Sequence, residues 1–200
     1  MPEQTVKDLK KELYLVMHKA EEMLELTEEG FIRNKLASLD RADEINKEIQ
    51  SREDALTTML AKMASQNNEA RAVLSVPSHV EKIATSIKRI TESSRIRIKE
   101  GMLFSDKAIL ETGQLFTKAK EVLKKASDAV VTGAPATIES VLKESDIMDN
   151  MANNFATAHE ERLVTGECSP KSSSTYLCIL YAFDDMGAHL KEAVRRLSGK

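Results

Sequence analysis

The sequence predicts an all-α protein, a six-helix bundle, from three observations. Apolar residues recur three and four positions apart along most of the 200 residues, and no segment shows the alternation of a half-buried strand. Aromatic residues make up only 4% of the chain and Trp is absent, so residues that favour strands are scarce. Ala, Leu, Glu, Lys and Met, which favour helices, are abundant instead.

Three helices are expected in the first half of the chain. They span, in order, Thr5 to Glu29, Arg33 to Ser65 and Glu69 to Lys99. Gly30 is expected to cap the first helix, because glycine adopts the left-handed conformation of a helix end without strain. Pro77 should either kink the third helix or mark its true start, because proline lacks the N–H that a helix interior needs.

Three further helices are expected in the second half. They span, in order, Ser105 to Val131, Ala136 to Val164 and Thr175 to Leu197. Ser105 is typical of a helix N-cap, and Pro135 suits a first helical position. The segment TGECSPKSSS, Thr165 to Ser174, is the longest loop-like stretch. Long helices joined by short turns favour an antiparallel bundle.

The two halves of the chain look like copies of one unit. Gly30 and Gly133, Asp43 and Asp146, and Glu81 and Asp184 are each separated by 103 residues. At the same offset VEKIATSIK lies over FDDMGAHLK, so acid meets acid and apolar residues coincide. We therefore expect two tandem three-helix repeats, residues 1–101 and 102–200, packed as one compact unit.

Composition excludes several classes of function. The net charge of −3 argues against nucleic-acid binding, which usually requires a basic excess. No apolar run approaches the length of a membrane span, and the N-terminus lacks an apolar signal core, so we expect a cytoplasmic protein without direct membrane insertion. Cys168 and Cys178 are expected to be free thiols. Without a nucleophile elbow, a P-loop or a dinucleotide fingerprint, the protein is not expected to be an enzyme.

Acidic segments on the second and third helix of each half connect the chain with a known family. The acidic segments read D-E-I-N at 43–46, E-K-I-A-T-S at 81–86, D-I-M-D at 146–149 and D-D-M-G-A-H at 184–189. The stretch that precedes the last of them, H-E-E-R-L-V-T-G-E-C-S-P at 159–170, belongs to the same comparison. In these segments the chain resembles the PhoU family of phosphate-transport regulators, whose two three-helix repeats carry a signature of the form E-R-I-G-D-H. It is most similar to the PhoU-like cytoplasmic domain of bacterial sodium/phosphate cotransporters.

The resemblance implies a regulator of phosphate uptake or phosphate signalling that acts by docking. Its expected partner is a membrane phosphate transporter or a phosphate-sensing histidine kinase. Family members can bind iron or zinc through E/D-x-x-x-D motifs, so the resemblance also implies metal ligands. The candidates are Asp43, Glu81, Asp146, Asp149, Asp184 and His189. Thr85 and Ala188 replace the second acid of the two motifs, which leaves each third helix one ligand short.

A helical wheel separates the candidates on the sixth helix. At about 100° per residue, Asp184 and His189 fall at opposite edges of the apolar face, and Asp185 points away from it. This disfavours one metal site built from all three and favours a solvated flank with an Asp185–His189 pair. The lysines at 118–125 are likewise expected to form a solvated face. Two other functions stay open, a metal-binding helical protein and a structural or oligomerising bundle, and so does homo-oligomerisation.

Overall fold

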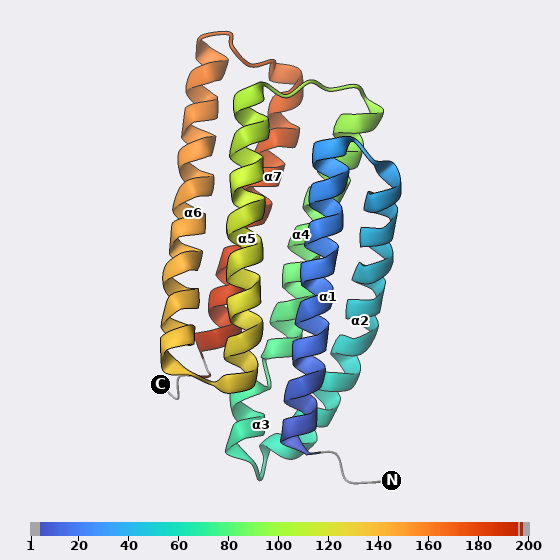
Figure 1. Ribbon diagram of the computed structural model, residues 1–200, viewed down its shortest axis with the longest axis vertical. Helices are drawn as coiled ribbons and strands as arrows, with labels where there is room; N and C mark the ends of the chain where they lie inside the picture. Colours follow the sequence, from blue (N-terminus) through green and yellow to red (C-terminus); the bar gives the residue numbers. More distant parts are fainter. Residues whose placement is uncertain (1–4, 196, 198–200) are drawn as a thin grey trace.

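A computed structural model of the protein describes residues 5–195 and 197, and every regular element within them is helical. In chain order the elements are α1 (Val6–Arg33), α2 (Leu36–Ala64), α3 (Asn68–Val73), α4 (Val76–Lys99), α5 (Asp106–Thr132), α6 (Pro135–Val164) and α7 (Pro170–Arg195). Six of these are long, which confirms the predicted all-α class and six-helix bundle (Figure 1). The expected repeats also include residues 1–4, 196 and 198–200, which lie outside the described residues.

The six long helices form two groups of three. Helices α1, α2 and α4, the first group, contact one another, and so do α5, α6 and α7, the second group (Figure 1). The groups join where α1 packs against α5 and where α4 packs extensively against α7. The division into two repeats at residue 101 stays a prediction. It falls in the connection between α4 and α5, where Gly101 has a φ of 59°.

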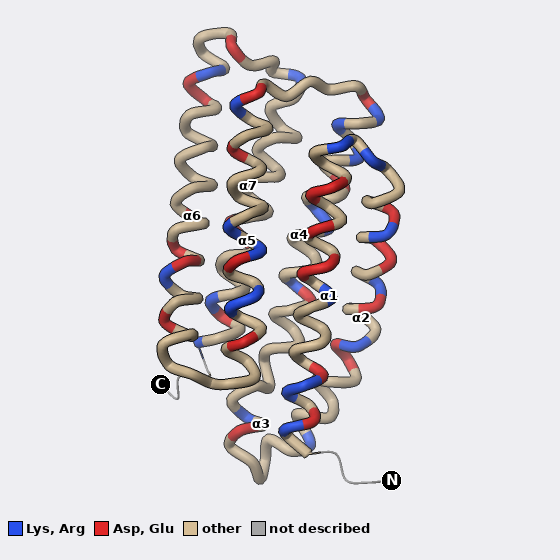
Figure 2. The backbone as a smooth tube through the Cα atoms, in the orientation of Figure 1, with Lys and Arg blue, Asp and Glu red and all other residues tan. Residues whose placement is uncertain are grey.

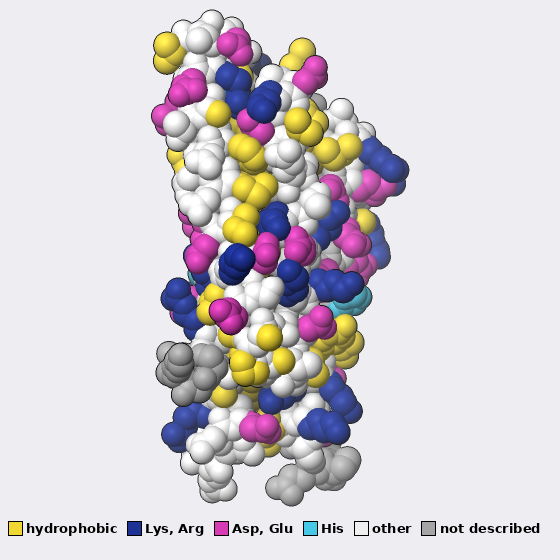
Figure 3. All heavy atoms as spheres, turned by 60° about the vertical axis from the view of Figure 1, so that its left-hand side comes forward, with side chains coloured by type: hydrophobic (Ala, Val, Ile, Leu, Met, Phe, Trp, Pro, Cys, Tyr) yellow, Lys and Arg dark blue, Asp and Glu magenta, His cyan; other side chains and the backbone are white. Residues whose placement is uncertain are grey.

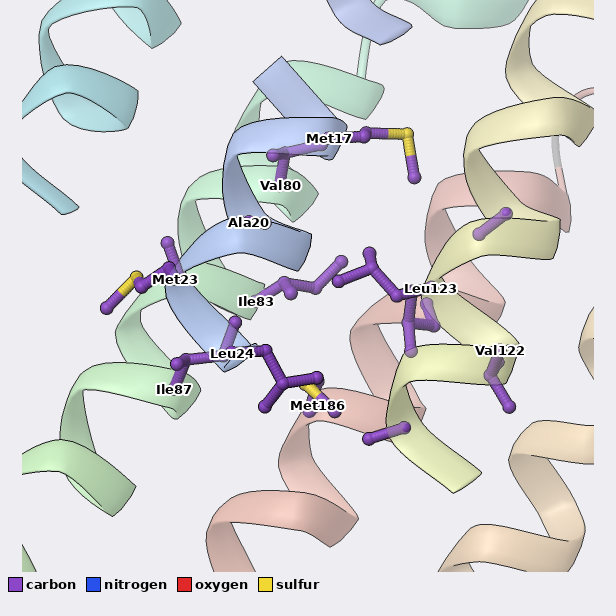
Figure 4. Close-up of a cluster of buried hydrophobic side chains, with 14 of the residues drawn as sticks. Met17, Ala20, Met23, Leu24, Val80, Ile83, Ile87, Val122, Leu123 and Met186 are labelled. Atoms are coloured by element: carbon purple, nitrogen blue, oxygen red, sulfur yellow. The ribbon is translucent and has the colours of Figure 1, made fainter. Parts of the chain in front are cut away.

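One hydrophobic core extends through both groups. Figure 4 shows Met17 and Leu24 of α1, Ile83 of α4, Leu123 of α5 and Met186 of α7 in one cluster of side chains. All five are fully buried. Burying a side chain of this size contributes about 1.5–3 kcal/mol to folding. Side chains of both groups therefore share this core.

The boundary between the first two helices differs from the expectation. Helix α1 continues past Gly30 to Arg33, and Asn34 adopts the left-handed conformation at its end, with φ 53° and ψ 37°. Asparagine tolerates this conformation because its short polar side chain can bond locally. Gly30 is buried inside α1, where a Cβ would overlap the Leu39 side chain of α2. The predicted cap at Gly30 is therefore wrong, and this glycine instead permits close approach of α1 and α2.

Pro77 and Pro170 each lie at the start of a helix. Pro77 lies in the first turn of α4, so the second of the two expectations for it is confirmed and the expected third helix divides into α3 and α4. Pro170 is the first residue of α7, which begins before the expected Thr175. The N–H that proline lacks has no partner in a first helical turn, so proline is tolerated there. The serine-rich segment after Pro170 is therefore helix rather than loop.

The predicted starts of the fourth and fifth helices are confirmed. Ser105 caps α5, and its Oγ accepts a hydrogen bond of 3.2 Å from the backbone N–H of Ala108. Pro135 is the first residue of α6. Gly133 ends α5 in the left-handed conformation, with a φ of 62°. Gly30 and Gly133, which the sequence offset pairs, thus have different structural roles.

Candidate functional site

An acid pair on α6 encloses a lysine from α7. Asp146 and Asp149 are three positions apart and therefore share one face of the helix. The Nζ of Lys191 lies 2.9 Å from Asp146 Oδ1 and also donates a hydrogen bond to Asp149 Oδ2. The Asp146 side chain is 66% exposed, whereas those of Asp149 and Lys191 are 19% and 17% exposed. One ammonium group thus bridges two carboxylates and joins α6 to α7.

Asp184 brings a third carboxylate to this cluster. Burial raises the pKa of Asp184, and the negative charges of Asp149 and Asp185 raise it further. Burial also raises the pKa of Asp149, although its hydrogen bond with Lys191 acts in the opposite direction. The Asp149 carboxylate lies against Gly187 of α7, where a Cβ would overlap it. The glycine of the acidic signature therefore provides the space for this carboxylate.

A second acid pair has the same arrangement in the first group. Arg95 of α4 places Nη1 2.5 Å from Asp40 Oδ1 and Nη2 2.6 Å from Asp43 Oδ2, so one guanidinium bridges two carboxylates of α2. Asp43 is the more buried member of its pair, as Asp149 is of the other. Among the described residues, the buried Oδ1 of both acids has no hydrogen-bond partner. Asp43 thus corresponds in its contacts to Asp149, whereas the sequence offset pairs it with Asp146.

Glu81 and His189 lie near each other where α4 meets α7. Burial lowers the pKa of His189, and the positive charge of Lys82 lowers it further, whereas the charge of Glu81 acts in the opposite direction. The Thr85 hydroxyl donates a hydrogen bond of 3.0 Å to Glu81 Oε1. Thr85 is the residue that replaces the second acid of the motif. In this copy, the position of the missing acid therefore supplies a hydroxyl donor to the remaining carboxylate.

The predicted separation of the acidic signature across α7 is confirmed. Asp184 lies near Asp149 of α6, on one flank of the helix. His189 lies on the other flank, with its ring centroid 5.8 Å from that of His79 in α4. Asp185 accepts a hydrogen bond from Arg89 of α4, a contact between helices that the spacing along α7 does not reveal.

The candidate ligands do not fit the iron or zinc that the resemblance implies. Over residues 5–195 and 197, no three His, Cys, Asp or Glu side chains are placed to hold one metal ion. Such a site needs several ligands that converge on one point. At each acid pair the carboxylates instead contact a cation of the chain itself, Lys191 or Arg95. Neither residue was among the candidates, because the candidates were metal ligands and both of these residues are cations.

A buried polar network in the second group was not predicted. Arg162 of α6 donates two hydrogen bonds to Glu111 of α5, with Nη1–Oε1 at 3.0 Å and Nη2–Oε2 at 2.7 Å. The hydroxyl of Tyr176 in α7 donates to the same Oε2 at 2.5 Å. The side chains of Glu111 and Arg162 are only 2% and 11% exposed. One signal was available, because Glu111 lies on the apolar face of its helix, three residues after Ala108 and four before Leu115.

A cavity of about 260 Å³ adjoins this network where α5 and α7 begin. Its lining includes His159, Cys168 and Tyr176. Burial lowers the pKa of His159, and the charge of Arg162 lowers it further, so the imidazole is neutral at pH 7. Its Nε2 lies 2.9 Å from the hydroxyl of Ser173. The hydrogen-bond partner of this imidazole is thus a serine of α7 rather than Cys168, which is not in a disulfide and whose Sγ lies 4.0 Å from the Ser105 hydroxyl.

The predicted basic cluster on α5 is mostly ion-paired. Lys118 and Lys125 contact Glu121, and Lys120 contacts Glu28 of α1 at 2.5 Å. Figure 2 shows acidic and basic positions interspersed along α1 and α5. The face in Figure 3 also carries side chains of both signs, with hydrophobic ones between them. The lysines therefore form a neutralised, partly exposed face, which agrees with the expected solvated surface.

An apolar groove of about 390 Å³ lies on the outer face of α1 and α5. Tyr14 and Leu15 from α1 and Val131 from α5 line it, and all three are exposed. Lys11 and Asp128 line it as well and bring one charge of each sign. Exposed apolar side chains gathered in a concave site are typical of surfaces that contact another molecule.

The helix arrangement is that of the PhoU-like bundles. The phosphate transport regulatory protein PhoU from Streptococcus pneumoniae matches with a TM-score of 0.84 at 12% identity, over 96% of this chain and 92% of that one. PhoU from Pseudomonas aeruginosa matches with a TM-score of 0.83 at 14% identity, over 95% and 93%. A putative PhoU-like phosphate regulatory protein from Shewanella oneidensis matches with a TM-score of 0.62 at 15% identity, over 95% and 94%.

The sequence comparison points in the same direction. The phosphate-specific transport system accessory protein PhoU homolog 1 of Thermotoga maritima is 24% identical over 185 residues, which cover 91% of this chain and 79% of the relative. No protein-family model matches the chain. The chain is thus similar to a PhoU homolog in sequence and to PhoU structures in fold.

Proposed function

We propose that this protein is a regulator of phosphate transport or phosphate signalling that acts by docking to another protein rather than by catalysis. The observation that carries the proposal is the similarity to PhoU proteins, because the sequence match and the fold matches each cover 91% or more of the chain. The Thermotoga maritima relative is described as an accessory protein of a phosphate-specific transport system. An accessory role requires contact with other components, and helix faces are well suited to such contact.

The proposed partner is a membrane phosphate transporter or a phosphate-sensing histidine kinase, approached from the cytoplasm. No helix of the described chain is both long and apolar enough to cross a bilayer. Sodium/phosphate cotransporters are one class of candidate partner, and the similarity to their PhoU-like domain stays a prediction.

The proposed docking surface is the groove between α1 and α5. Leu15 and Val131 offer exposed apolar area that an amphipathic helix of the partner would cover. Lys11 and Asp128 would orient that helix through its polar flank, because they present opposite charges at the same groove. The ion-paired lysines of α5 offer less to an anionic partner, since glutamates already neutralise most of them.

The test is co-purification from detergent-solubilised membranes. Tagged protein is expected to capture the phosphate transporter or the sensor kinase, and the variant Leu15→Glu should lose this capture. Ile32→Glu is the matched control, because Leu15 and Ile32 are 47% and 48% exposed on the same helix but only Leu15 lines the groove. Capture of neither partner by the wild-type protein would overturn the docking proposal, and equal loss with both variants would overturn the choice of surface.

The two alternative functions give different results in the same preparation. A metal-binding protein would carry bound iron or zinc after purification without chelator, and an oligomerising bundle would elute as a multimer that captures neither partner. The salt-bridged acid pairs favour docking over metal binding, because their carboxylates already contact internal cations.

A further inference from the structure

We infer that Lys191 and Arg95 are internal counter-ions, which occupy positions where a bound cation would otherwise be needed. Lys191 thereby links α7 to α6, and Arg95 links α4 to α2. This inference rests on the side-chain geometry and is independent of the proposed docking function.

The contacts of Lys191 carry the first part of the inference. Its ammonium group donates to carboxylates of both Asp146 and Asp149. Asp184 lies near enough for the charges of Asp149 and Lys191 to act on its carboxyl group. Two carboxylates therefore contact one largely buried ammonium, and a third lies near them. Carboxylate oxygens are the ligands that hard divalent ions prefer, so an ammonium in this position takes the place of such an ion.

Arg95 provides a second, separate instance. Its guanidinium reaches Asp40 with one nitrogen and Asp43 with the other. Both acid pairs have a spacing of three residues on the second long helix of their group, and both cations come from the third long helix. The recurrence of one arrangement in both groups argues against a chance surface contact, which would contribute little to stability.

Removing the positive charge should reveal the replaced cation site. In Lys191→Met the apolar stem is kept, but the carboxylates of Asp146, Asp149 and Asp184 are left without an ammonium. Mutual repulsion among these three acids lowers stability, and a divalent ion that binds only the folded state restores it. The wild-type protein should respond little, because a divalent ion would first have to displace Lys191.

The experiment compares melting temperatures with and without about 1 mM MnCl₂, a large excess over the protein. Lys191→Met is expected to melt below the wild type and to gain about 2–4 °C with Mn²⁺, whereas the wild type should gain less than about 1 °C. Adding Asp149→Asn to Lys191→Met should abolish the gain. Lys88→Met is the matched control, because Lys88 occupies the corresponding sequence position but pairs with Glu92 of its own helix at 3.5 Å.

If Lys191→Met folds, either of two results would overturn the inference. One is a wild-type protein that binds Mn²⁺ as tightly as Lys191→Met, measured by titration calorimetry. The other is a folded Lys191→Met that gains nothing from Mn²⁺. If Lys191→Met does not fold, Lys191→Arg decides the matter, since it keeps the positive charge. A folded Lys191→Arg that ignores Mn²⁺ supports the inference, and an unfolded one contradicts it.

Discussion

Each group of helices buries an arginine near the end of the bundle where α4 leads into α5. The two guanidinium groups have different hydrogen-bond partners. In the second group, Arg162 forms a two-bond ion pair with Glu111. In the first group, Arg97 donates to the backbone carbonyl of Phe31 and, at 2.6 Å, to the side-chain oxygen of Asn34. Its guanidinium also lies over the Phe31 ring, 4.6 Å from the centroid.

This difference shows in the charge balance of the two sites. Burial lowers the pKa of Arg97, which has neutral acceptors and aromatic rings as its described contacts. The pKa of Arg162 is raised, because its hydrogen bonds to Glu111 outweigh the effect of burial. Removing one member of a buried ion pair strands the other charge, whereas removing Arg97 strands only neutral acceptors. The pair in the second group is therefore the more sensitive site.

The two sites are also connected. The Phe104 ring lies 5.3 Å from the Arg97 guanidinium and packs edge-on against Tyr176, with centroids 5.6 Å apart. Tyr176 in turn donates its hydroxyl to Glu111. The connection between α4 and α5 thus places an aromatic ring between the two arginine sites, and both groups contribute to packing at this end of the bundle.

The largest expected effect is from Glu111→Gln. It leaves the Arg162 charge buried without its carboxylate, which should lower the free energy of unfolding by about 3–5 kcal/mol. Urea unfolding followed by circular dichroism measures the loss. Glu44→Gln is the control, because Glu44 pairs with Arg41 on the surface and its change should stay within about 0.5 kcal/mol. A loss below about 1 kcal/mol for Glu111→Gln would break the comparison.

Arg97→Met should have a smaller effect. It removes hydrogen bonds to two neutral acceptors and two cation–π contacts, so we expect a loss of about 1–3 kcal/mol in the same unfolding experiment. The control is Arg33→Met, since Arg33 is exposed and forms an ion pair with Glu29 on the surface at 3.6 Å. If Arg97→Met costs as much as Glu111→Gln, the carboxylate is not what distinguishes the two groups.

The smallest expected effect is a pH dependence that arises in the second group. Burial and the Arg162 charge hold the pKa of His159 below 6.5 in the folded state, although Glu111 and Glu160 oppose the shift. Below pH 6.5 the unfolded chain binds a proton that the folded chain does not, so stability present above this pH is lost as the pH falls. The slope is at most about 1.4 kcal/mol per pH unit for one histidine.

Melting curves at pH values on both sides of 6.5 measure this contribution as the difference between wild type and His159→Asn. The asparagine variant should lose less stability on acidification. His189→Asn serves as a comparison, because His189 lies outside the buried network, where α4 meets α7. Burial and the charge of Lys82 lower the pKa of His189 there. Identical pH profiles for the wild type and His159→Asn would show that the buried network does not hold this imidazole neutral.

Local patterns in the sequence were sufficient for most of the fold. The apolar period predicted six long helices, and proline and serine predicted the starts of α5 and α6. The end of α1 was missed because a glycine at this place in the sequence is typical of a helix cap. In the structure Gly30 instead lies against the Leu39 side chain of α2. The start of α7 was missed because a serine-rich segment reads as loop although Pro170 can begin a helix.

The candidate site was predictable only in part. Spacing alone places Asp146 and Asp149 on one face of α6 and separates Asp184 from His189 on α7, and the structure agrees. The same spacing could not identify Lys191 as the partner of both α6 acids, because it lies 42 residues beyond Asp149 on another helix. It also could not show that Gly187 makes room for the Asp149 carboxylate.

The sequence by itself determined the helical class, the order of the helices, the faces on which the acids stand and the resemblance to PhoU regulators. All of these depend on residue type and on a period of 3.6, which are local properties. Only the tertiary structure decided what each acid meets: Lys191 and Arg95 at the two pairs, and Arg162 at Glu111. That outcome depends on how far one helix is shifted and rotated against the next, which is set by the packing of the whole core.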